Sequence, residues 1–409
     1  MDILTIIYLS YSFVALYFLF LFILIYVYHR KDIFYCPKLT KNYSLSIVVP
    51  CYNEKENIAG TIQALLDSDY KGLKKIFIVD DRSTDGSYKI IKEFAKKYSK
   101  VVALRTPKNT GKASGAKNFG AKFVKTELIG FTDADSYPQK EAIRKSIGFF
   151  NNKNLGAVTS LVLVKERKRF IEKLQAIEYK IIAFTRKLLG FVGAIYVAPG
   201  PLVIYRKKHF DEIGGFDETN LTEDIEIIWN FVSKGYDIEM SVPAKVYTVA
   251  PNNFKDWFNQ RIRWNVGGLQ TINKYKSSFL KKNILGWFIL PFFILSWFLG
   301  IFGLFVVGYR VFRRFAVEFL SATYSVSANT ALLTLREINL NPSILVFFGI
   351  AVFLLSLFFT FVALLHFREK EFKNFGLLSI SIYMLVYLLS YPPLLIVSIY
   401  KFFRRKIIW

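Results

Sequence analysis

Residues 127–135 read Glu-Leu-Ile-Gly-Phe-Thr-Asp-Ala-Asp, a short apolar run that ends in two carboxylates one residue apart. Such a run is typical of a buried β-strand. Because side chains alternate between the two faces of a strand, Asp133 and Asp135 are predicted to point to the same side. Carboxylate oxygens are the ligands of hard divalent cations, so this pair predicts a site for one Mg²⁺ or Mn²⁺ shared with a diphosphate.

The same succession of apolar run and polar strand end occurs three times upstream. Strands are expected over residues 45–49, 75–79 and 101–104, and they are followed by helices over 54–69, 86–97 and 111–125. This alternation predicts an α/β fold, with a Rossmann-like, mostly parallel sheet covered by helices on both faces. Ligands of such sheets bind beyond the carboxyl ends of the strands. The polar motifs at those ends are Tyr52-Asn53-Glu54, Asp80-Asp81, Asn109 to Lys112 and Asp133 to Asp135.

The N-terminal residues predict a membrane helix. Residues 3–28 carry no charge and exceed the roughly 20 residues that span hydrocarbon. A signal peptide would need a basic start and a small-residue cleavage site, and the sequence has neither. The first basic residues are Arg30 and Lys31, so the N-terminus is expected outside the cell membrane and the domain that starts at residue 30 on its cytoplasmic side.

The C-terminal third of the chain is also predicted to contain membrane spans. Spans are expected over residues 284–307, 345–365 and 377–400, while 315–335 could be a fourth span, a re-entrant piece or an external loop. With three C-terminal spans the basic segment 401–406 would lie outside, and with four it would lie inside. The expected organisation is an N-terminal helix over 1–29, a cytoplasmic domain over 30–282 and a membrane region over 283–409.

A helix after residue 169 has two open interpretations. Its apolar residues recur at steps of four and three, and several basic residues lie largely off that face: Lys173, Lys180, Arg186 and Lys187. The helix could pack on the core, or it could lie in the membrane interface with its basic face toward lipid headgroups. Residues 268–282, which are rich in lysine, favour a second interfacial segment.

Charge and metal-ligand counts exclude some classes of partner. The net charge of +24 fits an anionic membrane face and an anionic substrate. Nucleic acid is not expected, because no basic-aromatic strip or zinc spacing is present. The three histidines do not cluster, so a histidine metal site is not expected either.

Two downstream motifs complete the set. Thr222-Glu223-Asp224 opens a predicted helix, where the acids could be mere caps or could include a general base. Gln260-Arg261-Ile262-Arg263-Trp264 could be a membrane-boundary anchor or could bind phosphate and a sugar ring. Each motif alone has a structural explanation, but their joint order favours a functional one.

Together these motifs make the chain resemble one known family of enzymes. It looks like a membrane-bound, inverting family-two glycosyltransferase with a GT-A catalytic domain, and it is similar to the cellulose, chitin and hyaluronan synthase superfamily. The resemblance covers roughly residues 44–270 and the pattern of flanking spans, and it rests on five separated motifs.

The resemblance implies roles on the donor side. Tyr52 and Glu54 would contact the nucleotide base, and Asp80 or Asp81 would bind uracil and ribose. Lys112 would meet the diphosphate. Asp133 and Asp135 would serve nucleotide and metal, with Asp135 as the more direct ligand.

It implies roles on the acceptor side as well. Asp224 would be the general base, with Glu223 beside it toward the acceptor. Gln260 and Arg263 would bind the diphosphate, and Trp264 the acceptor sugar. Gly200-Pro201 resembles the acceptor-side loop of the chitin- and hyaluronan-type branch.

The residues themselves support inverting sugar transfer. The departing diphosphate gains negative charge, which a metal at Asp135 with Lys112 and Arg263 can offset. Asp224 can take the proton of the attacking hydroxyl. The expected donor is a UDP-sugar, for example with N-acetylglucosamine or glucose, and the expected acceptor is a growing polysaccharide. The alternative is a single transfer to a membrane lipid, as in ceramide glucosyltransferases, because few spans are available for a polymer channel. A nucleotide-sugar binding protein without activity is not expected, since Asp135 and Asp224 are both present.

Overall fold

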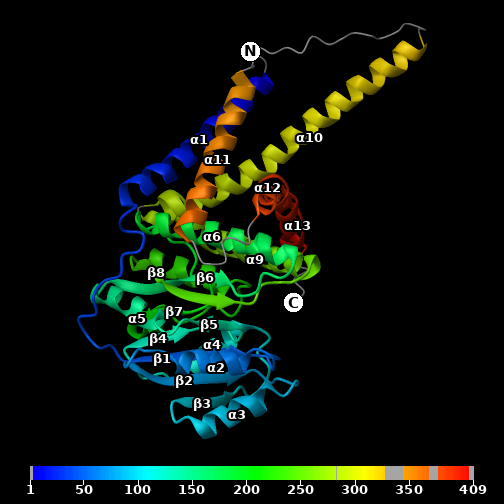
Figure 1. Ribbon diagram of the computed structural model, residues 1–409. Coiled ribbons are helices and arrows are strands. Elements are labelled where there is room, and N and C mark those ends of the chain that lie inside the picture. The colour runs from blue at the N-terminus through cyan, green and yellow to red at the C-terminus, as the bar shows by residue number, and fades with distance from the viewer. Residues whose placement is uncertain (1–2, 282, 328–343, 368–375, 405–409) are drawn as a thin grey trace.

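The computed structural model describes residues 3–281, 283–327, 344–367 and 376–404. An α/β domain lies at one end of the molecule and long apolar helices stand on one side of it (Figure 1). Between them lies a layer formed by α6 (Phe170–Gly190) and α9 (Phe254–Tyr275).

The α/β domain is built on one mixed sheet of eight strands in the order β3-β2-β1-β4-β7-β6-β8-β5. The strands are β1 (Leu45–Cys51), β2 (Leu73–Asp80), β3 (Val101–Arg105), β4 (Leu128–Phe131), β5 (Ser136–Pro138), β6 (Leu155–Val164), β7 (Val203–Arg206) and β8 (Asp237–Thr248). The first four are parallel, as the alternating pattern predicts. β1 pairs with both β2 and β4, so Cys51 lies beside Asp80 and Val48 beside Phe131. Their carboxyl ends therefore share one edge.

Helices cover both faces of this sheet. They are α2 (Ile58–Leu66), α3 (Ser87–Lys97), α4 (Ala113–Ala121), α5 (Ala142–Ile147), α7 (Lys207–Glu212) and α8 (Glu223–Ser233), with a 3₁₀ turn over Gly148–Asn151. Alternate residues of the same strands belong to two separate cores: Ile47 and Val49 pack with α2 and α3, whereas Val48 packs with α4. The core on the α4 side also includes residues of α6 and of the membrane helices, so the two parts of the molecule are continuous.

Helix α6 is packed inside the protein, which decides between its two interpretations. It lies between the sheet and the apolar helices (Figure 1). Lys180, Arg186 and Lys187 are all buried, and the Lys187 ammonium donates a hydrogen bond to the Met240 carbonyl. The prediction that a basic face meets lipid headgroups is therefore wrong for these three residues. In the segment 268–282, Lys276 and Lys281 are exposed, so this part agrees with an interfacial position.

Four helical segments are long and apolar enough to cross a membrane: Thr5–His29, Leu285–Tyr324, Phe347–His366 and Leu378–Phe403. The helices involved are α1 (Ile3–His29), a π-turn over Leu285–Ile289 followed by α10 (Leu290–Ser327), α11 (Ile344–His366), and a final series of α12 (Leu377–Ile382), turns over Tyr383–Tyr387 and Leu388–Ser390, and α13 (Tyr391–Phe403). Residues 315–327, part of the ambiguous segment, continue α10. Residues 328–335 lie outside the described parts.

The last helical series packs back onto the α6–α9 layer. Residues from Ile380 to Phe402 belong to one cluster with residues of α6 and α9. The end of α13 lies beside the α/β domain (Figure 1). α13 therefore ends against α9, although the segment to which it belongs has the composition of a span.

Helix α9 also fixes the start of α8. The Gln270 side chain accepts a hydrogen bond from the Leu221 amide, and Asn220 donates one to Thr271. A Cβ added at Gly267 would lie 2.1 Å from Thr222 Oγ1. Only glycine at 267 permits this contact, which holds the Thr222-Glu223-Asp224 segment against α9.

We expect Gly267→Ala to lower the thermal midpoint of the purified protein. Overpacking costs about 1–3 kcal/mol, which exceeds the gain of about 1 kcal/mol from replacing a helical glycine by alanine. Gly308→Ala is the matched control, because Gly308 also lies in a helix but has no atom within 4 Å of its added Cβ. Equal shifts of the two midpoints would contradict the close contact.

Candidate active site

The carboxylates that follow β4 gather at the shared edge of the sheet. Asp133 and Asp135 lie beyond the end of β4, in the turn before β5, and both are partly exposed with the buried Ala134 between them. Burial, together with the charges of Asp133 and Glu54, raises the pKa of Asp135 to about 7. Burial also raises the pKa of Glu54, and the charge of Asp133 adds to this effect. Three acids from two strand ends therefore repel one another here.

A buried lysine joins this edge to the start of α8. The ammonium of Lys117, on α4, lies 2.8 Å from Glu223 Oε1 and 3.4 Å from Asp133 Oδ1. Burial alone would lower the pKa of Lys117, but the charges of Glu223 and Asp133 outweigh it and raise the pKa above its ordinary value. Lys117 therefore stays charged and connects the donor-side acid to the Thr222-Glu223-Asp224 motif.

The two acids of that motif have different environments. Burial opposes ionisation of Glu223, but the Lys117 ammonium outweighs it and lowers the pKa of Glu223. Burial and the charge of Glu223 raise the pKa of Asp224 to about 7. Among the described residues, the Asp224 carboxylate accepts one hydrogen bond, from the Ile225 amide. Of the two acids, Asp224 is the one suited to take up a proton near neutral pH.

The first two strand ends are tied together by backbone and side-chain hydrogen bonds. Asn53 adopts a left-handed conformation at φ 54°, its amide donates to Ser83 Oγ, and its side chain accepts from the Thr84 amide. This turn leaves the Tyr52 ring 52% exposed, where it can stack on a planar ligand. It also explains why α2 begins at Ile58 and not at Glu54, since residues 54–57 belong to the turn.

Asp80 and Asp81 point into the protein. Asp80 is fully buried and its Oδ2 lies 2.9 Å from Arg105 Nε. The Asp81 carboxylate accepts hydrogen bonds from the hydroxyl groups of Thr106 and Thr110 at 2.7 Å each, and from the Thr110 amide. Both carboxylates thus hold the end of β3 and the loop after it in place, a role that the sequence motif alone does not reveal.

Lys112 contacts a segment that the sequence did not link to it. Its ammonium donates a hydrogen bond to the Thr219 carbonyl at 2.9 Å. Thr219 lies three residues before the Thr222-Glu223-Asp224 motif. In this structure Lys112 therefore holds the segment that leads to Asp224.

The predicted acceptor-side loop lies directly against the first carboxylate of the pair. A Cβ at Gly200 would lie 2.1 Å from Asp133 Oδ2, so a side chain here would displace that carboxylate. The carbonyl of the buried Pro201 accepts a hydrogen bond from Ser160 at 2.7 Å, which anchors the loop on β6.

Helix α9 presents the last motif beside α6. Arg263 is exposed, and its charge acts on both Glu223 and Asp224. Gln260 accepts a hydrogen bond from Arg261. The Trp264 ring is partly exposed and lies between the Arg261 guanidinium, 4.1 Å from the ring centroid, and the Tyr179 ring, 6.5 Å away between centroids. The sequence did not indicate Lys117, Arg261 or Tyr179, because the lysine and the tyrosine belong to no motif and Arg261 was assigned no role within its motif.

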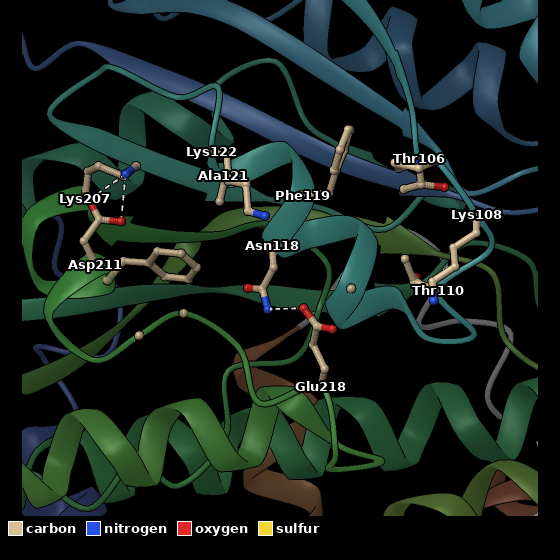
Figure 2. Close-up of a pocket in the computed structure, with 15 residues that line it drawn as sticks. Thr106, Lys108, Thr110, Asn118, Phe119, Ala121, Lys122, Lys207, Asp211 and Glu218 are labelled. Atoms are coloured by element: carbon tan, nitrogen blue, oxygen red, sulfur yellow. Dashed lines mark hydrogen bonds and ion pairs between the residues drawn. The ribbon is translucent and has the colours of Figure 1, made fainter.

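A separate cavity lies away from these residues. It measures about 800 Å³ and lies between α4, α7 and the loop after β3, where Figure 2 shows the Lys207–Asp211 ion pair and the Asn118–Glu218 hydrogen bond. None of the predicted site residues lines it. Consecutive residues of α4 separate the two places: Lys117 contacts Asp133 and Glu223, whereas Asn118 faces the cavity.

The acids after β4 fit a divalent cation only in part. Their oxygens are suitable ligands for Mg²⁺ or Mn²⁺. Within the described residues, however, no three His, Cys, Asp or Glu side chains come close enough to hold a metal by themselves. The site therefore fits a cation whose remaining ligands come from substrate phosphate and water.

Three comparisons relate the chain to known proteins. Residues 46–214 match the family described as glycosyl transferase family 2. A poly-β-1,6-N-acetyl-D-glucosamine synthase from Staphylococcus epidermidis is 28% identical over 366 residues, which are 88% of this chain and 84% of that protein. A synthase of the same name from Staphylococcus aureus strain COL is 28% identical over 250 residues, 61% of this chain and 60% of that protein.

A solved structure shares the whole fold. It is a mannosyltransferase from Pyrobaculum calidifontis in complex with GDP-Man and Mn²⁺, with a TM-score of 0.61 over 97% of this chain and 99% of that one. At 16% identity this likeness concerns the fold alone. The sheet, the match over residues 46–214 and the relatives agree: the chain is similar to glycosyl transferase family 2 over that region, and these findings support a nucleotide-sugar-dependent glycosyltransferase with a GT-A-like fold and apolar helices long enough to cross a membrane.

Proposed function

We propose that this enzyme transfers a sugar from a UDP-sugar to a hydroxyl of a growing polysaccharide, with inversion at the anomeric carbon. The observation that carries the proposal is the Asp133–Lys117–Glu223 chain of ion pairs. It holds the acids after β4 beside Asp224, so a donor and an acceptor hydroxyl can meet between them.

Asp224 is the proposed general base. It accepts the proton of the acceptor hydroxyl while that oxygen attacks the anomeric carbon from the face opposite the diphosphate, whose bond to the sugar breaks. The raised pKa of Asp224, about 7, suits a base that must take up a proton and release it again near neutral pH. The positive charge of Arg263, which acts on Asp224 and Glu223, is placed to offset charge on the departing UDP.

Asp135 and Asp133 are the proposed ligands of Mg²⁺ or Mn²⁺. When bound, the cation neutralises negative charge on the diphosphate. Tyr52 is the proposed stacking surface for the nucleotide base, and Glu54 the acid beside it. Asp80 and Asp81 contribute by shaping the loop after β3.

The polysaccharide product is supported by the relatives, which are named poly-β-1,6-N-acetyl-D-glucosamine synthases. UDP-N-acetylglucosamine is accordingly the first donor to test. We further propose that the catalytic domain is cytoplasmic, because Arg30 and Lys31 directly follow α1 and precede that domain, and basic residues beside a span stay on the cytoplasmic side.

Asp224→Asn is expected to lower transfer by at least about 10²-fold while UDP affinity stays unchanged, since a proton acceptor is lost and no donor contact is. Wild-type activity should fall as the pH drops through about 7, because protonated Asp224 cannot act as a base. Steady-state rates measured as a function of pH give the loss of transfer and its pH dependence. Calorimetric titration with UDP gives the UDP affinity. Glu218→Gln, an exposed neighbour in the preceding loop, is the control. Near-normal turnover of Asp224→Asn would place the base elsewhere.

Membranes that contain the enzyme are expected to convert labelled UDP-N-acetylglucosamine and Mg²⁺ or Mn²⁺ into a ladder of products. Excess EDTA should abolish the ladder, because the donor diphosphate would lose its counter-charge. Electrophoresis and solvent extraction distinguish the outcomes. A single organic-soluble product would indicate transfer to a lipid, and a full ladder in EDTA would exclude a required metal.

Trp264→Ala is expected to abolish transfer to the acceptor while donor hydrolysis by water and UDP affinity change little. Trp264→Phe should keep part of the activity, because another aromatic ring can still stack on a sugar. Specific activity per folded, detergent-purified molecule is the measurement. A membrane anchor would behave differently, since Trp264→Ala would lower the yield and leave the specific activity normal.

A further inference from the structure

A buried ion pair connects the two helices of the α6–α9 layer. The guanidinium of Arg261, on α9, binds the carboxylate of Glu178, on α6, and both side chains are almost completely buried. Two charges removed from water are stable only when further hydrogen bonds satisfy their remaining donors and acceptors. The question is therefore which groups complete this pair.

Two tyrosines of the last helical series complete it. The Tyr387 hydroxyl donates a hydrogen bond to Glu178 Oε2 at 2.6 Å, and the Tyr391 hydroxyl donates one to Glu178 Oε1. Arg261 Nε donates to the Tyr391 hydroxyl at 3.2 Å, and Trp257 Nε1 donates to the Tyr387 hydroxyl at 2.6 Å. The cluster thus joins three chain segments that are far apart in the sequence.

The same guanidinium also touches the proposed acceptor site. Arg261 Cζ lies 4.1 Å from the centroid of the Trp264 ring, one turn along α9. The ring of Tyr179, next to Glu178, lies 6.5 Å from the same ring between centroids. Any change in the position of Arg261 therefore reaches Trp264 directly.

We propose that Glu178, Tyr387 and Tyr391 are positioning residues for acceptor binding, because they fix Arg261, which in turn holds the Trp264 ring. The C-terminal helices thereby support the acceptor site, although of the residues in this cluster only Trp264 is proposed to meet the sugar. This inference rests on the acceptor role proposed for Trp264.

A merely structural role would give a different result. Loss of a stabilising contact lowers yield and thermal midpoint, and it affects donor and acceptor steps alike. A positioning role affects the acceptor step and leaves the donor step unchanged. The tyrosine hydroxyls allow this test, because phenylalanine keeps the ring and removes only the hydroxyl with its hydrogen bonds.

The experiment compares Tyr387→Phe, Tyr391→Phe and the double variant of the full chain in detergent. The donor is UDP-N-acetylglucosamine and the acceptor probe is a β-1,6-linked N-acetylglucosamine oligomer. We expect the double variant to lose about 10-fold in kcat/KM for the oligomer, mainly through KM, since a buried charge pair is left short of its hydrogen bonds. Donor hydrolysis without oligomer and UDP affinity should stay within about 2-fold.

Tyr383→Phe is the matched control. Tyr383 is buried one turn before Tyr387 and stacks on its ring at 5.4 Å, but its hydroxyl makes no hydrogen bond to the residues described. This variant should behave as wild type. Equal effects of Tyr383→Phe and the double variant, an unchanged double variant, or a parallel loss of donor hydrolysis would each overturn the positioning role.

A spectroscopic measurement keeps the test independent of any substrate. The contribution of Trp264 to the near-ultraviolet circular dichroism is obtained by subtracting the spectrum of Trp264→Phe from that of the wild type. We expect this difference to shrink in the Tyr387→Phe/Tyr391→Phe background and to persist in the Tyr383→Phe background. Persistence in both would overturn the positioning role. If Trp264→Ala transfers normally while the dichroism shrinks as expected, the acceptor role of Trp264 fails and the link to Arg261 holds.

Discussion

The Lys117 ammonium is the contact on which the active site depends. It is withdrawn from water, at a cost of several kcal/mol for an isolated ion, and this cost is offset only because Asp133 and Glu223 approach it from two sides. The end of β4 and the start of α8 therefore cannot separate without exposing an uncompensated charge. The different pKa shifts of Glu223 and Asp224 follow from the same contact, since Glu223 faces the lysine and Asp224 lies next to Glu223.

The α6–α9 layer extends this order to the membrane side. Gly267 brings α9 against Thr222, and the Glu178–Arg261 pair brings α9 against α6. The layer is thus fixed both to the base and to the final helices. The buried basic residues of α6 show that this helix is an internal part of the protein and does not lie on the lipid surface.

Much of the α/β domain could be predicted from the sequence, because strand and helix periods are local. The parallel strands and the shared edge follow from them, whereas Asp133 and Asp135 lie in the turn after β4 and not on the strand itself. The contacts of Lys117 could not be predicted, since they join α4 to a segment 106 residues downstream. The environment of α6 was missed for a related reason: amphipathic spacing shows that one face is buried, but not that a second layer covers the other. Asp80 and Asp81 lie at the predicted strand end, yet only the fold shows that they turn inward.

Helix α10 has a consequence for the surrounding bilayer. Its 38 residues extend about 57 Å at 1.5 Å per residue, nearly twice the roughly 30 Å of a hydrocarbon core. Near its start Phe292 packs on Phe18 of α1, whereas Phe312 and Phe315 are 71% exposed, and the helix slants away from α1 and α11 (Figure 1). Its apolar part ends near Val307, and a second part with Arg310, Arg313, Arg314 and Glu318 follows in the same helix. When the apolar part fills the hydrocarbon core, this charged part lies beyond it, so the tilt of α10 sets how far the charges stand from the lipid headgroups.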